Sequence, residues 1–194
     1  MSDGPAAEAL AAGGRAADGR AAGALAADAL APDDAPPPRR AVVVVASTGA
    51  ATGTRVDETG PVIRDWFAAR GWVVEGPVVV GDGEPVGSVL EAALDWGVDA
   101  VVTTGGTGVS PTDQTPEVTA PLLDRELPGI AEELRRRGVA STPTAVLSRG
   151  LAGVAGRTFV VNLPGSRGGV RDGLAVLDDL LDHVVDQLAG GAHG

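Results

Sequence analysis

Lysine, cysteine and tyrosine are absent from the 194 residues, and histidine occurs only twice. All fifteen basic residues are therefore arginines. A P-loop needs a lysine on its phosphates and Schiff-base enzymes need an amine nucleophile, so both classes are excluded. Without cysteine there are no disulfides, thiolate metal sites or cysteine nucleophiles. With only His183 and His193, a histidine-rich metal centre or a Ser-His-Asp triad is not expected.

Aromatic residues are also scarce, at 3% of the chain, so the core must be built from Val, Leu, Ala and Ile. The formal net charge of −11 argues against a nucleic-acid partner. A phosphorylated substrate would have to be attracted locally, by backbone amides, a few arginines and a divalent cation. No apolar stretch is long enough for a membrane span or a signal peptide, and we expect a cytoplasmic location.

The chain divides into two parts by composition. Residues 1–40 are mostly Ala, Gly, Pro, Asp and Arg, which bury too little apolar surface to offset the entropy of ordering. We expect a disordered extension there. Residues 41–190 carry periodic apolar patterns and are expected to form one domain.

The first half of the domain alternates strands with helices. Buried strands are expected at 41–46 and 98–104, with two short strand runs at 72–80 that are broken at Gly76. Helices are expected from Gly60 to Arg70 and around 86–94. This order indicates a doubly wound α/β fold with a parallel sheet, in which ligands collect at the carboxyl ends of the strands.

The second half is expected to break the parallel pattern. A helix from Pro116 and another ending at Gly138 should precede two antiparallel strands at 144–148 and 157–162, whose connection is too short for a helical crossover. The three arginines at 135–137 are expected at the C-terminus of the second helix, where they complement its dipole. One long helix should follow, with an apolar seam from Val170 to Leu188.

The most informative stretch is VDAVVTTGGTGVSPTDQTPE, residues 98–117. Gly105, Gly106 and Gly108 follow a buried strand, and they permit positive φ and close approach of a ligand to the backbone. Thr115 is expected to cap a helix that has Pro116 at its first position. This pattern is typical of an anion cradle, although many glycine turns after a strand only reverse the chain.

Two aspartates are candidates for holding Mg²⁺ against a polyphosphate. Asp82 follows the strand run at 72–80 and Asp113 follows the glycine turn, so both belong to the ligand edge of the expected sheet. Hard oxygen ligands from one or two carboxylates are how proteins usually hold this ion. The alternatives are local: Asp82 lies between two glycines, where an Asx-turn is common, and Asp113 could begin the helix.

A second candidate phosphate site lies at the start of the last helix. Arg167 and Arg171 occupy a position where the helix dipole disfavours cations, and a facing anion would remove that cost. The amides of Gly165 and Ser166 would add donors. Alternatively, both arginines point into solvent. Hydroxyls at the same edge, such as Ser47, Thr104 and Thr107, lack a base and suggest positioning rather than nucleophilic attack.

The order of these motifs resembles the MogA/MoaB family of molybdenum-cofactor biosynthesis proteins. The resemblance covers nearly all of residues 41–188, and it includes TTGGTG with Asp113, Gly-Asp-Gly at 81–83, Leu-Ser-Arg at 147–149 and Asn-Leu-Pro-Gly-Ser at 162–166. It implies a three-layer α/β/α sandwich whose five-stranded sheet is mostly parallel with one antiparallel strand. One departure is Ser47-Thr48, where many relatives carry Ser-Asp, so an acid from that loop is in doubt.

The resemblance further implies a molybdopterin adenylyltransferase that uses Mg-ATP, releases pyrophosphate, forms trimers or hexamers and meets a MoeA-like molybdenum insertase. Asp82 and Asp113 would be the catalytic pair and the Mg²⁺ ligands. The residues implied to bind substrate and nucleotide are Ser47, Thr104, Gly105, Gly106, Thr107, Gly108, Pro164, Gly165, Ser166 and Arg167.

Two other functions fit the same motifs. Some family members keep the fold without detectable adenylylation, so a non-catalytic molybdopterin-binding protein of the same pathway is one alternative. A nucleotide hydrolase of the related CinA group is another. The Thr-Gly-Gly-Thr-Gly form of the loop and the expected single domain count against the second alternative.

Overall fold

A computed structural model describes residues 37–190 of the chain. The extension expected at residues 1–40 lies outside this range up to residue 36. Arg39 and Arg40, the last two residues of the expected extension, contact the folded domain. Arg39 pairs with Asp182 and Asp186 near the end of the described chain, and the Arg40 amide donates to the Asp99 carboxylate at 2.7 Å.

The strands of residues 37–190 form one six-stranded sheet in the order β2-β1-β3-β6-β5-β4. The four strands from β2 to β6 run parallel, and β5 is antiparallel to both of its neighbours. The predicted mostly parallel sheet with one antiparallel strand is confirmed, and a two-residue edge strand adds to the five expected. The strands are β1 (Arg40–Ala46), β2 (Val73–Val80), β3 (Ala100–Thr104), β4 (Arg125–Glu126), β5 (Ala152–Ala155) and β6 (Thr158–Leu163).

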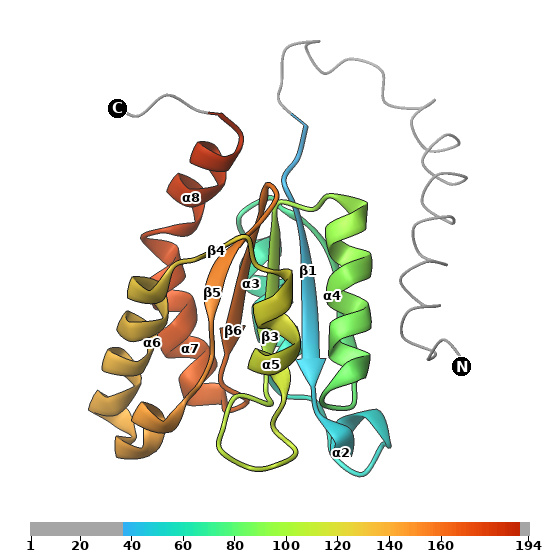
Figure 1. The fold of residues 1–194 in the computed structure, drawn as a ribbon, viewed down its shortest axis with the longest axis vertical. Helices are drawn as coiled ribbons and strands as arrows, with labels where there is room; N and C mark the ends of the chain where they lie inside the picture. The colour runs from blue at the N-terminus through green and yellow to red at the C-terminus, as the bar shows by residue number, and fades with distance from the viewer. Residues whose placement is uncertain (1–36, 191–194) are drawn as a thin grey trace.

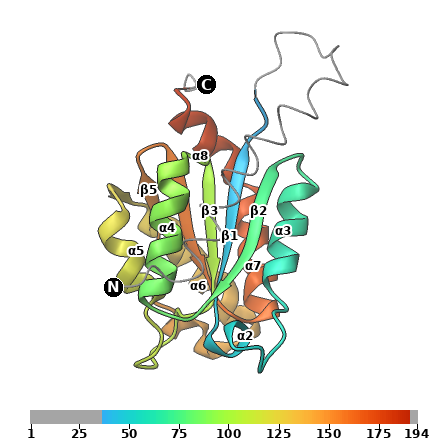
Figure 2. The same cartoon turned by 90° about the vertical axis from the view of Figure 1, so that its right-hand side faces the viewer.

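Helices cover both faces of the sheet, which confirms the three-layer α/β/α sandwich (Figures 1 and 2). Helices α3, α7 and α8 pack on one face and α4 and α5 on the other, while α6 packs beside α7. The helical segments are α2 (Thr48–Ala51), α3 (Gly60–Ala68), α4 (Glu84–Trp96), α5 (Thr115–Thr119), η1 (Ala120–Leu122), α6 (Pro128–Ser141), η2 (Pro143–Leu147), α7 (Arg167–Asp178) and α8 (Leu181–Leu188).

Strand β1 shows why the sheet is central to the fold. Its valines alternate between the two layers: Val43 packs with Ile63 and Phe67 of α3, whereas Val42 and Val44 pack on the α4 side. All three valines are fully buried. A continuous run of β-branched residues suits a strand with helices on both faces, because both sets of side chains leave water.

Two strand predictions need correction. The runs at 72–80 form the single strand β2, whose pairing with β1 shifts register between Val42 and Val44. The segment predicted as a strand at 144–148 is mostly the 3₁₀ helix η2, and Val146 and Leu147 in it are exposed. The antiparallel partner of β6 is instead Ala152–Ala155, inside the stretch predicted as a connection.

Two helix predictions also differ from the structure. Helix α6 continues past Gly138 to Ser141, so the arginines at 135–137 lie in its interior rather than at its C-terminus. There, Arg136 and Arg137 pair with Glu133. The long C-terminal helix is two helices, α7 and α8, which continue one apolar seam through Leu177 and Leu181.

The loops at the carboxyl ends of β1, β2, β3 and β6 gather at one edge of the sheet, as parallel topology requires (Figure 1). The beginning of β1 and the end of α8 lie at the other edge (Figure 1). Within residues 37–190, no helix combines the length and the apolar character needed to cross a membrane.

Candidate functional site

The glycine loop, residues 105–108, follows β3 at the centre of the ligand edge. Gly105 and Gly106 have φ values of 94° and 61°, in the left-handed region that favours glycine. The Gly105 amide donates to the Leu163 carbonyl at 3.1 Å, and a Cβ at Gly105 would collide with the Ala46 carbonyl oxygen. The loop therefore packs closely against the ends of β1 and β6, where no side chain fits.

The two predicted aspartates meet on this loop. A Cβ on Gly106 would collide with Asp82 Oδ1, and a Cβ on Gly108 would lie 2.7 Å from Asp113 Oδ2. The Ser110 amide donates to Asp113 Oδ2 at 3.1 Å and orients that carboxylate. Burial raises the pKa of Asp82, and the nearby negative charge of Asp113 raises it further. The structure thus brings the two carboxylates together.

Two buried oxygen atoms beside Gly106 have no hydrogen-bond partner among the described residues: Asp82 Oδ1 and Thr115 Oγ1. They lie 2.0 and 2.3 Å from the position that a Gly106 Cβ would take, so the two oxygens are close to each other. Thr115 is fully buried and begins α5, whose N-cap is Gln114, so its hydroxyl does not cap the helix as the sequence predicted. Buried polar atoms are normally satisfied, and unpaired oxygens beside a glycine suit a hard cation.

This arrangement fits Mg²⁺ held together with a ligand, and does not fit a cage made by protein alone. Among residues 37–190, no group of three or more His, Cys, Asp or Glu side chains is placed to hold a metal. Mg²⁺ commonly takes one or two carboxylates and completes its shell with waters and substrate phosphates. Asp82 and Asp113 would supply that protein share.

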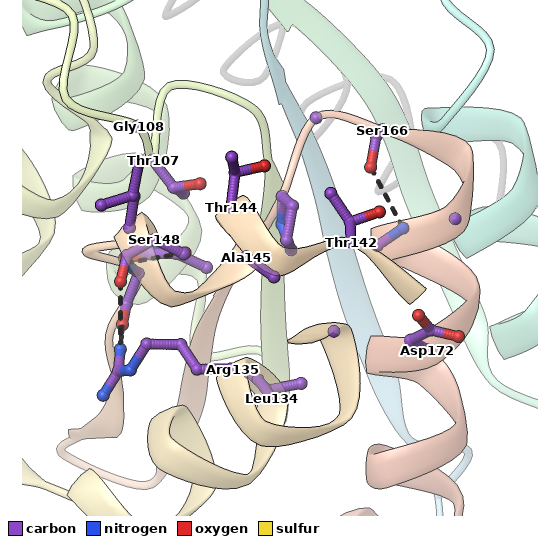
Figure 3. A pocket seen from close by; sticks show the side chains of 18 of the residues that line it. Thr107, Gly108, Leu134, Arg135, Thr142, Thr144, Ala145, Ser148, Ser166 and Asp172 are labelled. Carbon is purple, nitrogen blue, oxygen red and sulfur yellow. Dashed lines mark hydrogen bonds between the residues drawn. The ribbon is translucent and has the colours of Figure 1, made fainter. Parts of the chain in front are cut away.

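A pocket of about 540 Å³ opens beside the glycine loop. The sequence-predicted residues that line it are Gly105, Gly106, Thr107, Gly108, Asp113, Pro164, Gly165 and Ser166. The opposite wall comes from α6 and from η2 with its flanking residues. Figure 3 shows Leu134 and Arg135 on α6, with Thr142, Thr144 and Ala145 across from them. This second wall was not predicted, because α6 follows the edge strand β4 rather than a strand that ends at the ligand edge.

Four predicted site residues do not line this pocket. Asp82 lies against the glycine loop without reaching the pocket wall. The Thr104 hydroxyl donates to the Pro164 carbonyl at 2.8 Å and joins two strand ends. The Ser47 hydroxyl caps α2 by accepting from the Ala50 amide at 3.3 Å. Arg167 pairs with Glu58 at 3.0 Å, and both side chains are exposed.

The start of α7 completes the near side of the pocket. The Ser166 hydroxyl accepts from the Gly169 amide at 3.1 Å and caps the helix (Figure 3). Gly168, Gly169 and Arg171 line the pocket, together with Asp172. Of the two arginines predicted to face an anion, Arg171 is therefore the one at the pocket, whereas Arg167 is held by Glu58.

Asn162 and Arg149 support the site, although the sequence predicted no role for either of them. Asn162 is buried; its amide nitrogen donates to the hydroxyls of Thr103 at 3.0 Å and Thr119 at 3.1 Å, and its oxygen accepts from the Leu151 amide at 3.1 Å. Arg149 binds three carbonyl groups of the glycine loop and its continuation. The sequence did contain an indication for Asn162, because it is a polar residue at the end of the mostly apolar strand run TFVVN.

The glycine loop, Asp113 and the start of α7 line one pocket at the carboxyl edge of an α/β sandwich, and Asp82 lies directly behind the loop. The sequence matches the family described as "Probable molybdopterin binding domain" over residues 41–183. The chain belongs to this family, and within it to the MogA/MoaB proteins, as its motifs predicted.

Relatives and solved structures agree with this assignment. The chain is 40% identical over 156 residues to the molybdenum cofactor biosynthesis bifunctional protein of Chlorobaculum tepidum, covering 79% of this chain and 50% of the relative. It is 36% identical over 103 residues to the molybdopterin adenylyltransferase of Helicobacter pylori, covering 53% and 58%. The Mog protein structure from Mycobacterium ulcerans is 50% identical, has a TM-score of 0.75, and is matched over 80% of this chain and 99% of that one. The chain spans about half the length of the first curated relatives it matches.

The family places the protein in molybdenum cofactor biosynthesis.

Proposed function

We propose that this protein is a molybdopterin adenylyltransferase, which joins the adenylyl group of Mg-ATP to the terminal phosphate of molybdopterin and releases pyrophosphate. The observation that supports it most is the meeting of Asp82 and Asp113 on the glycine loop beside a pocket of about 540 Å³. The name of the Helicobacter pylori relative points to the same reaction.

The proposed reaction needs little proton chemistry. An oxygen of the molybdopterin phosphate attacks the α-phosphorus of ATP, a new P–O–P bond forms, and the bond to the bridging oxygen of the β-phosphate breaks as pyrophosphate leaves. The attacking group is already an anion, so the absence of His from the pocket lining is no obstacle. Alignment and charge neutralisation would supply most of the rate enhancement.

The residues of the site have separate roles in this proposal. Asp82 and Asp113 would hold Mg²⁺, which neutralises phosphate charge as the leaving group departs. The amides of the glycine loop and of Gly165 and Ser166 would orient phosphates. Arg171 would add a positive charge at the pocket wall. Thr104, Ser47 and Arg167 would support the loops rather than contact the ligands, given their observed partners.

The assembly and the partner belong to the same proposal. We expect a homotrimer or hexamer, and transfer of the adenylylated product to a MoeA-like molybdenum insertase.

The direct test is release of pyrophosphate by the purified protein with Mg-ATP and molybdopterin. Asp82→Asn and Asp113→Asn should each lower kcat/KM by about 10²–10³-fold, because a metal ligand is lost. Asp65→Asn is the matched control, since Asp65 is exposed and its carboxylate pairs, among residues 37–190, with its neighbour Arg64 alone. Molybdopterin binding without any pyrophosphate release would instead identify a non-catalytic binding protein.

Measurements of stability distinguish a variant that has lost a metal ligand from one that no longer folds. The pKa of Asp82 is raised in the folded protein, so its ionised form opposes folding. That stability cost begins near pH 4, the ordinary aspartate pKa, and is complete above the raised pKa. Asp82→Asn should therefore keep or raise the melting temperature at pH 7 without Mg²⁺, and it should show a smaller fall in stability as the pH rises from about 4. Lower stability at pH 7 would contradict this account of the Asp82 carboxylate.

A further inference from the structure

Arg149 fastens both ends of the segment that carries Asp113. Its backbone amide donates to the Thr107 carbonyl at 2.9 Å. Its side chain donates from Nε to the Gly108 carbonyl and from Nη2 to the Asp113 carbonyl, each at 2.6 Å. The remaining nitrogen, Nη1, pairs with Glu117 on α5. One residue therefore holds the start and the end of the 107–113 segment and ties it to the following helix.

Only an arginine can make these contacts together. The guanidinium presents a planar set of donors in fixed directions, and here three different nitrogens reach three different acceptors. A lysine keeps the positive charge but concentrates its donors on one nitrogen, so it cannot span the Gly108 and Asp113 carbonyls and Glu117 with the same geometry.

Arg149 also connects the two walls of the pocket. Its neighbours Ser148 and Gly150 line the pocket, and their carbonyls both accept from Arg135 of α6 at 3.3 Å (Figure 3). The chain of contacts runs from α6, through residues 148–150, to the glycine loop and Asp113. Arg149 itself is not among the residues lining the pocket. Its contacts are with the protein, not with the space that a ligand would fill.

From this geometry we propose that Arg149 is a positioning residue that holds the Asp113 carboxylate and the glycine-loop amides in register with the wall formed by α6 and η2. The proposal rests on the adenylyltransferase function, because it assigns to Arg149 the alignment that the transfer step needs. A displacement of about 1 Å at a reacting group can cost about 100-fold in rate. Loss of Arg149 should therefore lower kcat while leaving the affinity for substrates nearly intact.

The test compares Arg149→Lys with the wild-type full chain. Hydrogen exchange of backbone amides at residues 105–114 should become at least about tenfold faster in the variant, because local opening of the loop becomes easier. Amides of β1 and β3 should be unaffected. In the pyrophosphate-release assay, kcat should fall by about 30–100-fold, and the KM values for Mg-ATP and molybdopterin should change less than about threefold.

Two further variants keep the result interpretable. Arg136→Gln is the matched control, because it removes an exposed arginine of α6 whose partner within the described part of the chain is Glu133, and it should change neither readout. Glu117→Gln removes the negative charge that pairs with Arg149, keeps an acceptor oxygen there, and leaves the bonds of Arg149 to the carbonyls. It should give an intermediate effect on loop exchange and on kcat.

Three outcomes would overturn the proposal: unchanged exchange at residues 105–114 in Arg149→Lys, an unchanged kcat, or a loss confined to KM, which would indicate a charge that binds substrate. If the wild-type protein releases no pyrophosphate, the adenylyltransferase function fails by itself. The exchange experiment then still decides whether Arg149 orders the loop.

Discussion

Thr115 carries a buried hydroxyl that the described part of the fold leaves unpaired, whereas the hydroxyl of Thr119, one turn later on α5, is fully used. Thr119 donates to the Thr115 carbonyl at 2.7 Å and accepts from Asn162. The two threonines are both buried and differ mainly in hydrogen bonding. Removing each hydroxyl in turn therefore distinguishes an oxygen atom that binds a ligand from one that stabilises the fold.

We expect Thr115→Val to raise the free energy of unfolding by up to about 1 kcal/mol in the absence of ligands, because it removes a buried polar atom without a partner. The same change should weaken Mg²⁺-dependent nucleotide binding severalfold. Thr119→Val should lower the free energy of unfolding by about 1–3 kcal/mol, since it leaves the Asn162 amide short of an acceptor. Urea unfolding and calorimetric titration measure both quantities. A destabilised Thr115→Val with unchanged nucleotide binding would show that the hydroxyl is structural.

For single residues, the sequence predicted the location of side chains that directly follow strands. It did not predict contacts between residues that are distant in the chain. Asp82 and Asp113 were predictable because parallel strands bring their carboxyl ends to one edge. Arg149 acts on carbonyls 36 and 41 residues away, through a loop whose path no periodic pattern describes. Arg167 was predicted to face an anion from its place at a helix start, but the prediction could not include Glu58, which comes from another loop.

Among the elements, the glycine loop at residues 105–108 is closely enclosed by its neighbours. Gly106 and Gly53 both adopt positive φ, at 61° and 74°. A Cβ on Gly53 would meet nothing within 4 Å, whereas a Cβ on Gly106 would collide with Asp82 and Thr115. The two positions therefore share the backbone cost of a side chain and differ in the steric cost.

Gly53→Ala should lower the free energy of unfolding by about 1 kcal/mol, the cost of a left-handed alanine. Gly106→Ala should lower it by at least about 3 kcal/mol, because the overpacking of a buried site is added to the same backbone cost. It should also abolish pyrophosphate release. Denaturant unfolding gives the comparison. Equal losses in the two variants would show that the space beside Gly106 relaxes easily.

Elements were predicted well where their apolar pattern was strong and poorly where it was absent or misleading. Val146 and Leu147 suggested a strand, yet they are exposed on η2. The true strand β5 reads AGVA, with little side-chain volume, and a Cβ at Gly153 would lie 2.6 Å from the Arg125 carbonyl of β4. Close packing there selects small residues and so erases the strand signal. The break between α7 and α8 carries no glycine or proline, and the apolar seam runs across it.

For the whole molecule, the charge balance opposes an anionic substrate. The chain carries a net charge of −11, while the charged side chains that line the pocket, Asp113, Arg135, Arg171 and Asp172, cancel. The long-range field should therefore repel nucleotide and pterin phosphates, and attraction should come only at short range.

Raising the ionic strength from about 0.03 to 0.3 M should increase kcat/KM for molybdopterin about two- to fivefold, because the Debye length shortens and the long-range repulsion is screened. The value of kcat at saturating substrate should change little. Stopped assays at fixed free Mg²⁺ and Mg-ATP give the comparison. A steep fall of kcat/KM with salt would show that a positive local field at the pocket outweighs the net charge.

Strand β1 begins and helix α8 ends at the edge of the sheet opposite the pocket (Figure 1). A second domain joined directly at residue 37 or at residue 190 would lie at that opposite edge, and the opening of the pocket would stay uncovered. This arrangement leaves room for a further domain without blocking the pocket. The Chlorobaculum tepidum relative is a bifunctional protein about twice the matched length.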